Sequence, residues 1–98
     1  MLNWKKASKG DLKRLQAIEM ILARYSYLLE QIFSATDPCL LGSPQGLMRA
    51  RSSGEKVLIG ISLDLWNSSA GIKILDLNNL DDENFENVFS ALKFLRAR

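Results

Sequence analysis

The longest regular pattern of apolar residues in the chain runs over residues 11–33. Apolar side chains recur there at alternating spacings of three and four residues, with no Gly or Pro between them. This spacing is that of one face of an α-helix. The apolar positions are Leu15, Ile18, Leu22, Tyr25, Leu29 and Ile32, widened by Ile21, Leu28 and Phe33. The pattern predicts a long helix that docks onto a sheet, either alone or together with a dimer contact.

From residue 47 onward the pattern changes to a period of two, which is typical of β-strands. Residues 47–51 and 56–64 flank the polar stretch 52–55, and glycine in that stretch favours a tight connection. These two arms predict a β-hairpin. A third strand is predicted over residues 72–77, after a turn-rich segment. The order of these segments predicts a three-stranded antiparallel meander.

A second helix is predicted to begin after Asp81. Aspartate is a favoured N-cap residue, and Asp82 and Glu83 follow in the first turn. Basic residues lie near the end of the segment, so the charges oppose the helix macrodipole at both ends. These basic residues are Lys93, Arg96 and Arg98. The predicted apolar face consists of Phe85, Val88, Phe89, Leu92 and Leu95.

These elements predict one α+β domain over residues 1–98, in the order helix, three-stranded antiparallel meander, helix. We expect both helices to pack on one face of the small sheet. The 98 residues suffice for one domain. Residues 35–45 are expected to form a loop because each of their prolines disfavours a helical conformation in the preceding residue. Residues 1–9 are interpreted as a mobile basic tail.

The composition is that of a globular domain, with 47% hydrophobic and 24% charged residues. The chain contains no apolar run long enough to span a bilayer, so we expect no membrane association. Its one cysteine, Cys39, cannot form an internal disulfide bond, which fits a reducing compartment. We therefore expect the protein to lie in the cytoplasm.

The residues of the chain disfavour catalysis. The sequence has no histidine, which removes the usual general base near neutral pH and the commonest metal ligand. A carboxylate cluster comprises Asp76, Asp81, Asp82, Glu83 and Glu86, and helix capping explains most of it. Cys39 has no histidine to activate it, and no glycine-rich segment has P-loop spacing. We expect no catalytic centre, no metal and no cofactor.

The remaining function classes are both binding functions. The first is a non-enzymatic protein-interaction module that forms a homodimer or binds another protein. This hypothesis is supported by the wide apolar stripe of the first helix and by aromatic residues, which are enriched in interface hot spots. The candidate partner-binding residues are Ile21, Tyr25, Tyr27, Leu28, Trp66 and Phe94.

The alternative is a nucleic-acid-binding domain. An aromatic ring among cations can stack on a base while the cations contact phosphates. The candidate residues are Trp4, Lys5, Lys6, Lys9, Arg49 and Arg51. The net charge of only +2 and the acidic segment 76–86 count against this alternative.

Overall fold

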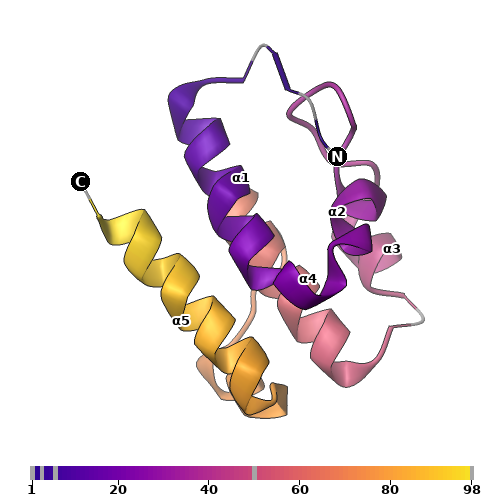
Figure 1. The fold of residues 1–98 in the computed structure, drawn as a ribbon. Coiled ribbons are helices and arrows are strands. Elements are labelled where there is room, and N and C mark those ends of the chain that lie inside the picture. Colours follow the sequence, from indigo (N-terminus) through magenta and orange to yellow (C-terminus); the bar gives the residue numbers. More distant parts are fainter. Residues whose placement is uncertain (1, 3, 6, 50, 98) are drawn as a thin grey trace.

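Helices dominate the computed structural model, which describes residues 2, 4, 5, 7–49 and 51–97 (Figure 1). In chain order the elements are α1 (Lys9–Ile21), the 3-10 helix η1 (Ala23–Tyr25), α2 (Tyr27–Ile32), α3 (Pro44–Met48), α4 (Ser53–Asn67), the 3-10 helix η2 (Ile74–Asn79) and α5 (Asp82–Arg96). No strand forms in these ranges, where one isolated bridge joins Phe33 to Leu40. The predicted α+β fold is wrong, because the chain is an all-helical globule.

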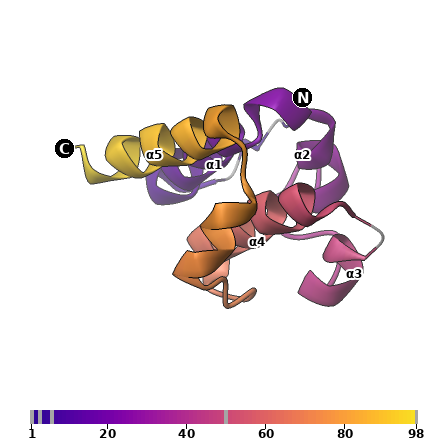
Figure 2. The same ribbon diagram turned by 90° about the horizontal axis from the view of Figure 1, so that it is seen from below.

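The helices form two layers. α1 and α5 run antiparallel in one layer, and α4 lies in the other together with α3 and η2 (Figure 2). α1 packs against both α5 and α4, so it joins the two layers. The core consists of apolar side chains from α1, α2 and α4, with contributions from α3 and α5.

The helix predicted over residues 11–33 is divided into two. α1 ends at Ile21, the chain turns through η1, and α2 begins at Tyr27. No Gly or Pro marks the break, and Leu22, which ends α1, is itself fully buried. The apolar residues of this segment cover too much of the circumference of a straight helix for one neighbour to bury. The turn lets both pieces pack into the same core.

The hairpin predicted over residues 47–64 is wrong, because its second arm lies in α4. The Ser52 side chain accepts a hydrogen bond from the Glu55 backbone N–H, and the Glu55 carboxylate accepts one from the Ser52 backbone N–H. The presumed turn is therefore a capping box. Every residue from 57 to 63 is buried. Periodicity cannot distinguish a short, continuously buried helix segment from a buried strand.

The other two predicted strands also overlap helices. In α3, Ser43 caps the N-terminus and Pro44 occupies the first turn, where its missing N–H costs nothing. The third predicted strand, residues 72–77, overlaps η2, where the Asp76 carboxylate accepts a hydrogen bond from the Lys73 backbone N–H. These local hydrogen bonds satisfy backbone groups that a strand would pair with a neighbour.

The helix predicted after Asp81 is confirmed as α5. The Asp81 carboxylate accepts a hydrogen bond from the Asn84 backbone N–H at 2.9 Å, which satisfies one of the free donors of the first turn. Val88 of the predicted apolar face is buried, as is Ala91, whereas Phe89 and Leu92 of that face are exposed. Arg98, predicted near its end, lies outside the described residues.

Trp4 is anchored in the core, although the sequence placed it in a mobile tail. It is buried and packs against Phe33 and Trp66, with ring centroids 5.4 Å from each. Its indole N–H donates a hydrogen bond to the Ser34 carbonyl at 2.8 Å. This aromatic cluster ties the start of the chain to α4 and to the end of α2.

Candidate functional site

An apolar groove lies between α4, η2 and α5. Its volume is about 230 Å³. The lining residues are Ile61, Asp64 and Leu65 of α4, then Ile72, Lys73, Ile74 and Leu77, and finally Val88 and Leu92 of α5. We call this hollow the α4–α5 groove.

Asp64 fixes the wall of the groove that follows α4. Its carboxylate accepts hydrogen bonds from the backbone N–H groups of Ala70, Gly71 and Ile72 at 2.8, 2.9 and 2.7 Å. Partial burial raises the pKa of Asp64, but these three donors outweigh it and hold the pKa below its ordinary value. The chain after α4 is thereby folded back onto the helix as far as Ile72.

Gly60 allows this folded-back segment to approach α4 closely. A Cβ atom on Gly60 would lie 2.3 Å from Cδ1 and 2.6 Å from Cγ1 of Ile72, well inside van der Waals contact. Any larger residue at position 60 would require the Ile72 side chain to shift from its place in the groove. Asp64 and Gly60 therefore act together to place Ile72 in the groove.

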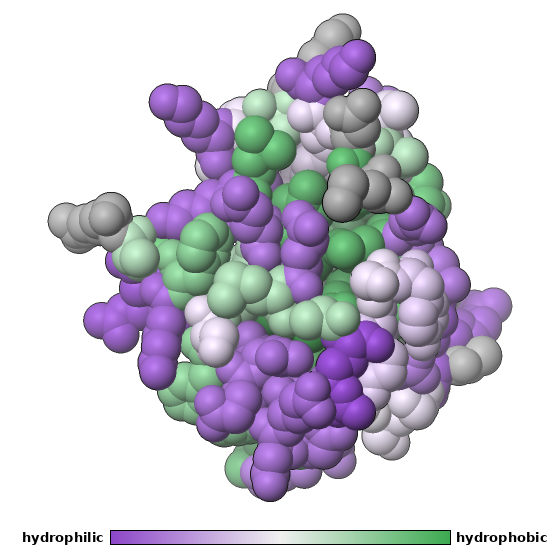
Figure 3. Space-filling model, viewed as in Figure 1, coloured by the Kyte–Doolittle hydropathy of each residue, from purple (hydrophilic) through white to green (hydrophobic). Residues whose placement is uncertain are grey.

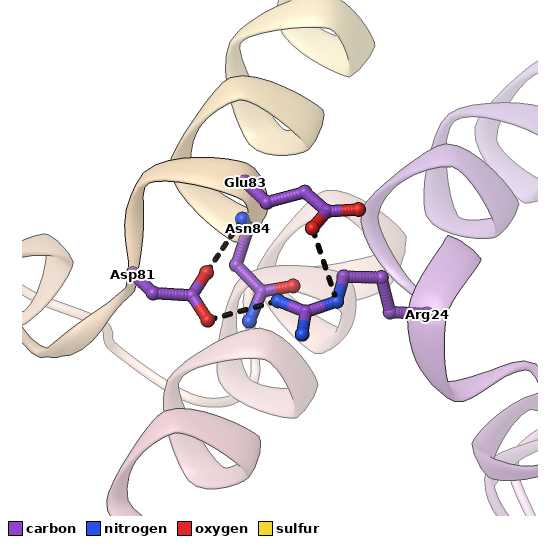
Figure 4. A network of polar contacts seen from close by, with 4 residues as sticks. All are labelled: Arg24, Asp81, Glu83 and Asn84. Atoms are coloured by element: carbon purple, nitrogen blue, oxygen red, sulfur yellow. Dashed lines mark hydrogen bonds and ion pairs between the residues drawn. The ribbon is translucent and has the colours of Figure 1, made fainter.

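The opposite wall, α5, is held by α1 and by a polar network at its N-terminus (Figure 4). Arg24 of η1 donates a hydrogen bond to Asp81 at 2.8 Å and lies 3.6 Å from Glu83. The pKa of Asp81 is lowered, chiefly by the Asn84 backbone N–H and next by Arg24. Asn84 is buried beside this network, and its side-chain oxygen has no hydrogen-bond partner among the described residues.

The other end of α5 is also attached to α1. The Lys13 ammonium group donates a hydrogen bond to the Ala97 carbonyl at 2.6 Å and lies 5.6 Å from the centre of the Phe94 ring. A cation over an aromatic face is an attractive contact. Both ends of α5 are thus fixed to the α1 side.

Large apolar side chains are exposed along and beside the groove. Ile74 is 85% exposed and Leu75 is 77% exposed in η2, while Phe89 and Leu92 of α5 are 47% and 41% exposed. Phe85 packs against Phe89, with ring centroids 5.2 Å apart. Apolar surface is visible at the lower left margin of Figure 3, between hydrophilic groups, along the path of α5. We call Ile74, Leu75, Phe85, Phe89 and Leu92 the rim of the groove.

Two further hollows lie on the described surface. The larger, about 460 Å³, is lined by Leu2, Glu19, Ser26, Tyr27, Leu29 and Glu30. The other, about 250 Å³, lies near α3 and mixes Lys56 and Asp76 with apolar residues. Both have a more polar lining than the α4–α5 groove.

The predicted partner-binding residues do not form one surface. Ile21 and Leu28 are fully buried, and Tyr25, Trp66 and Phe94 are half-buried. Tyr27 is exposed and donates a hydrogen bond to Glu55, which raises the pKa of the tyrosine. In the single chain, five of these six residues are therefore buried or half-buried.

The predicted nucleic-acid-binding residues are also scattered. Trp4 lies in the core and presents no free ring face for a base. Lys5, Lys9 and Arg49 are exposed, whereas Arg51 is half-buried and donates hydrogen bonds to Gln31 and to the Leu47 carbonyl. Lys6 lies outside the described residues.

The candidate residues for metal binding or catalysis do not form a common site among the residues that the structure describes. Within the described ranges, no three His, Cys, Asp or Glu side chains come together as a metal site. Cys39 is exposed in the loop after α2. Asp76 lies in η2, and its carboxylate accepts a hydrogen bond from the Lys73 backbone N–H.

No local signal in the sequence distinguishes the exposed apolar residues beside the groove from those of the core. Phe89 and Leu92 were placed on the buried face of the last helix, and Ile74 and Leu75 were placed in a strand. In each pair the residues are large and apolar, so only the position of neighbouring elements reveals that they are exposed.

Comparisons with known proteins find no matching protein family, no similar curated protein and no similar solved structure. In the part of the chain that the structure describes, no helix is both long and apolar enough to cross a membrane. The function has to be argued from the geometry of the groove.

Proposed function

We propose that this chain is a non-enzymatic protein-interaction module that binds its partner through the α4–α5 groove and its rim. The observation that carries the proposal is the exposure of Ile74, Leu75, Phe89 and Leu92 around an apolar groove. Contiguous exposed apolar surface on a folded domain is characteristic of protein–protein contact sites. Single exposed apolar residues would need no such explanation.

The lining of the groove favours binding over catalysis. Its titratable residues are Asp64 and Lys73, and the Asp64 carboxylate is already engaged by three backbone donors. Acid–base chemistry requires a group that is free to exchange a proton with a substrate. The rest of the lining offers apolar contact. The single Cys39 supports a reducing compartment, and we place the module in the cytoplasm.

Site-specific photocrosslinking tests this proposal in the cells that express the protein. A photoreactive residue at position 74 should give discrete adducts with a protein, because Ile74 projects from the rim. The matched control carries the same residue at position 16, where Gln16 is exposed on α1 outside the groove. Adducts at position 74 that disappear with Leu92→Glu support the proposal. Equal adducts at both positions, or none at either, contradict it.

A further inference from the structure

The exposed side of α5 carries charges arranged symmetrically about Phe89. Asp82 and Glu86 precede Phe89 by seven and three residues, and Lys93 and Arg96 follow it by four and seven. All five are exposed. Spacings of three, four and seven residues return to the same side of an α-helix. This outer face of α5 has an acidic half, an aromatic centre and a basic half.

The charges of the outer face are not used inside the described part of the chain. The ion pairs found there join Arg14 to Asp11 and Arg24 to Asp81 and Glu83. Among the described residues, the charged side chains of the outer face make no hydrogen bond and no ring contact. Both halves of the face are available to an external partner.

A second, antiparallel copy of α5 is complementary to this face. With the two Phe89 side chains at the centre, Glu86 of each copy lies opposite Lys93 of the other. At the ends, Asp82 of each copy lies opposite Arg96 of the other. A parallel arrangement would place like charges together, which is unfavourable. A two-fold axis makes every contact twice from one surface patch, which is how most dimers of identical chains are built.

We propose that the partner on this surface is a second copy of this chain, paired through α5 about a two-fold axis beside Phe89. This inference rests on the proposed function, because it assigns an occupant to the same surface. Leu92 belongs both to the groove and to the flank of the outer face, so a helix packed along α5 also covers the edge of the groove.

The two kinds of contact have different roles in this dimer. Phe85, Phe89 and Leu92 supply the apolar area that drives association. The charged pairs set the antiparallel orientation, since exposed ion pairs contribute little to stability. An interface about one helix wide is at the small end of specific interfaces. We therefore expect dimers at chain concentrations on the order of micromolar and above.

Charge reversal tests the pairing by sedimentation equilibrium of the purified protein. Wild-type protein should approach twice its chain mass of 11.0 kDa at high concentration. Glu86→Lys and Lys93→Glu should each weaken self-association about tenfold, because each variant opposes like charges twice in its own dimer. An equimolar mixture of the two variants should regain wild-type affinity within about twofold, since both opposite-charge pairs re-form in the mixed dimer.

Controls separate the pairing from effects on folding. Glu19→Lys reverses a charge on α1 away from this face and should leave association unchanged. Phe89→Ser should weaken association about tenfold or more while the circular dichroism spectrum stays that of the wild type. A mixture that associates no better than either variant alone overturns the proposed pairing.

The failure of this inference is distinguishable from the failure of the proposed function. A monomeric wild type that still crosslinks from position 74 to a protein of another mass refutes the second copy and leaves the interaction function in place. A monomeric wild type without adducts from position 74 refutes both.

Discussion

The aromatic cluster around Phe33 and the outer face of α5 around Phe89 use the same kinds of side chain in opposite ways. Phe33 is fully buried and lies 5.2 Å, centroid to centroid, from Trp66 and 5.4 Å from Trp4. Phe89 has one aromatic neighbour, Phe85, from its own helix, and 47% of its surface is exposed. Segments distant in the sequence converge on Phe33, whereas in the described part of the chain Phe89 is left about half exposed.

This difference separates residues that stabilise the fold from residues that are available for binding. Burial of an aromatic side chain removes a large apolar area from water, and the gain appears as folding free energy. In the single chain, much of the Phe89 side chain stays in contact with water, so the free energy that its full burial would provide is not gained. It becomes available when a partner covers the outer face of α5. The predictions below compare the two regions, from the largest expected effect to the smallest.

Phe33→Ala should lower the free energy of unfolding by about 3–5 kcal/mol, the usual loss for a large aromatic residue in a core. Phe89→Ala is the matched variant and should cost less than about 1 kcal/mol at concentrations where the chain is monomeric. Urea denaturation followed by circular dichroism measures both. Similar losses at the two positions would show that the outer face of α5 is part of the core.

Gly60→Ala tests the close approach that shapes the groove. The new methyl group should displace Ile72, and overpacking of this kind costs about 1–3 kcal/mol. In an Ile72→Ala background the same change should raise stability by up to about 1 kcal/mol, because alanine has the higher helix propensity. A double-mutant cycle from thermal or urea unfolding measures the coupling. Additive effects would mean that Gly60 and Ile72 do not touch.

Asp64→Asn should lower stability at pH 7 by about 1–2 kcal/mol, since it replaces a charged acceptor that solvent partly screens. The pKa of Asp64 is depressed below its ordinary value of 3.8, so its contribution is complete above that value and is lost as the pH falls through the lower, folded-state pKa. The two proteins should therefore converge in stability at acid pH. Unfolding curves from pH 7 downward measure this, and a constant difference would contradict the role of the carboxylate.

Ile74→Ser should change stability by less than about 0.5 kcal/mol, because this side chain is 85% exposed and loses little on truncation. The same substitution removes apolar surface from the rim. Partner crosslinking from a photoreactive residue at position 89 should decrease while the unfolding midpoint stays constant. A large loss of stability would place Ile74 in the core, in contrast to the exposure on which the proposed function rests.

Local capping signals in the sequence predict α5 correctly, whereas a similar signal at the start of α4 leads to a wrong prediction. Asp81 followed by acidic and later basic residues predicted α5 correctly, because capping and macrodipole effects act within single turns. The same kind of signal was present at Ser52 and Glu55, where a capping box begins α4. The apolar alternation over residues 57–63 is typical of a strand, so the stretch 52–55 before it resembles a hairpin turn.

The division of residues 11–33 into α1 and α2 could not be read from local chemistry. The heptad spacing continues across Leu22 without a glycine or proline. The bent segment buries Ile18, Leu22 and Leu28 in one shared core, which a straight helix cannot do against one neighbour. Most of this stripe is buried within the single chain for the same reason.

By itself the sequence determined the types of side chain available, the absence of histidine and the capping of α5, because these depend on composition or on contacts within a few residues. Only the tertiary structure decided which apolar residues are covered. Ile21 and Phe89 are both large and apolar, yet one is fully buried and the other is exposed. Burial depends on which elements cross above a residue, and α5 packs on α1 with its outer face open to solvent.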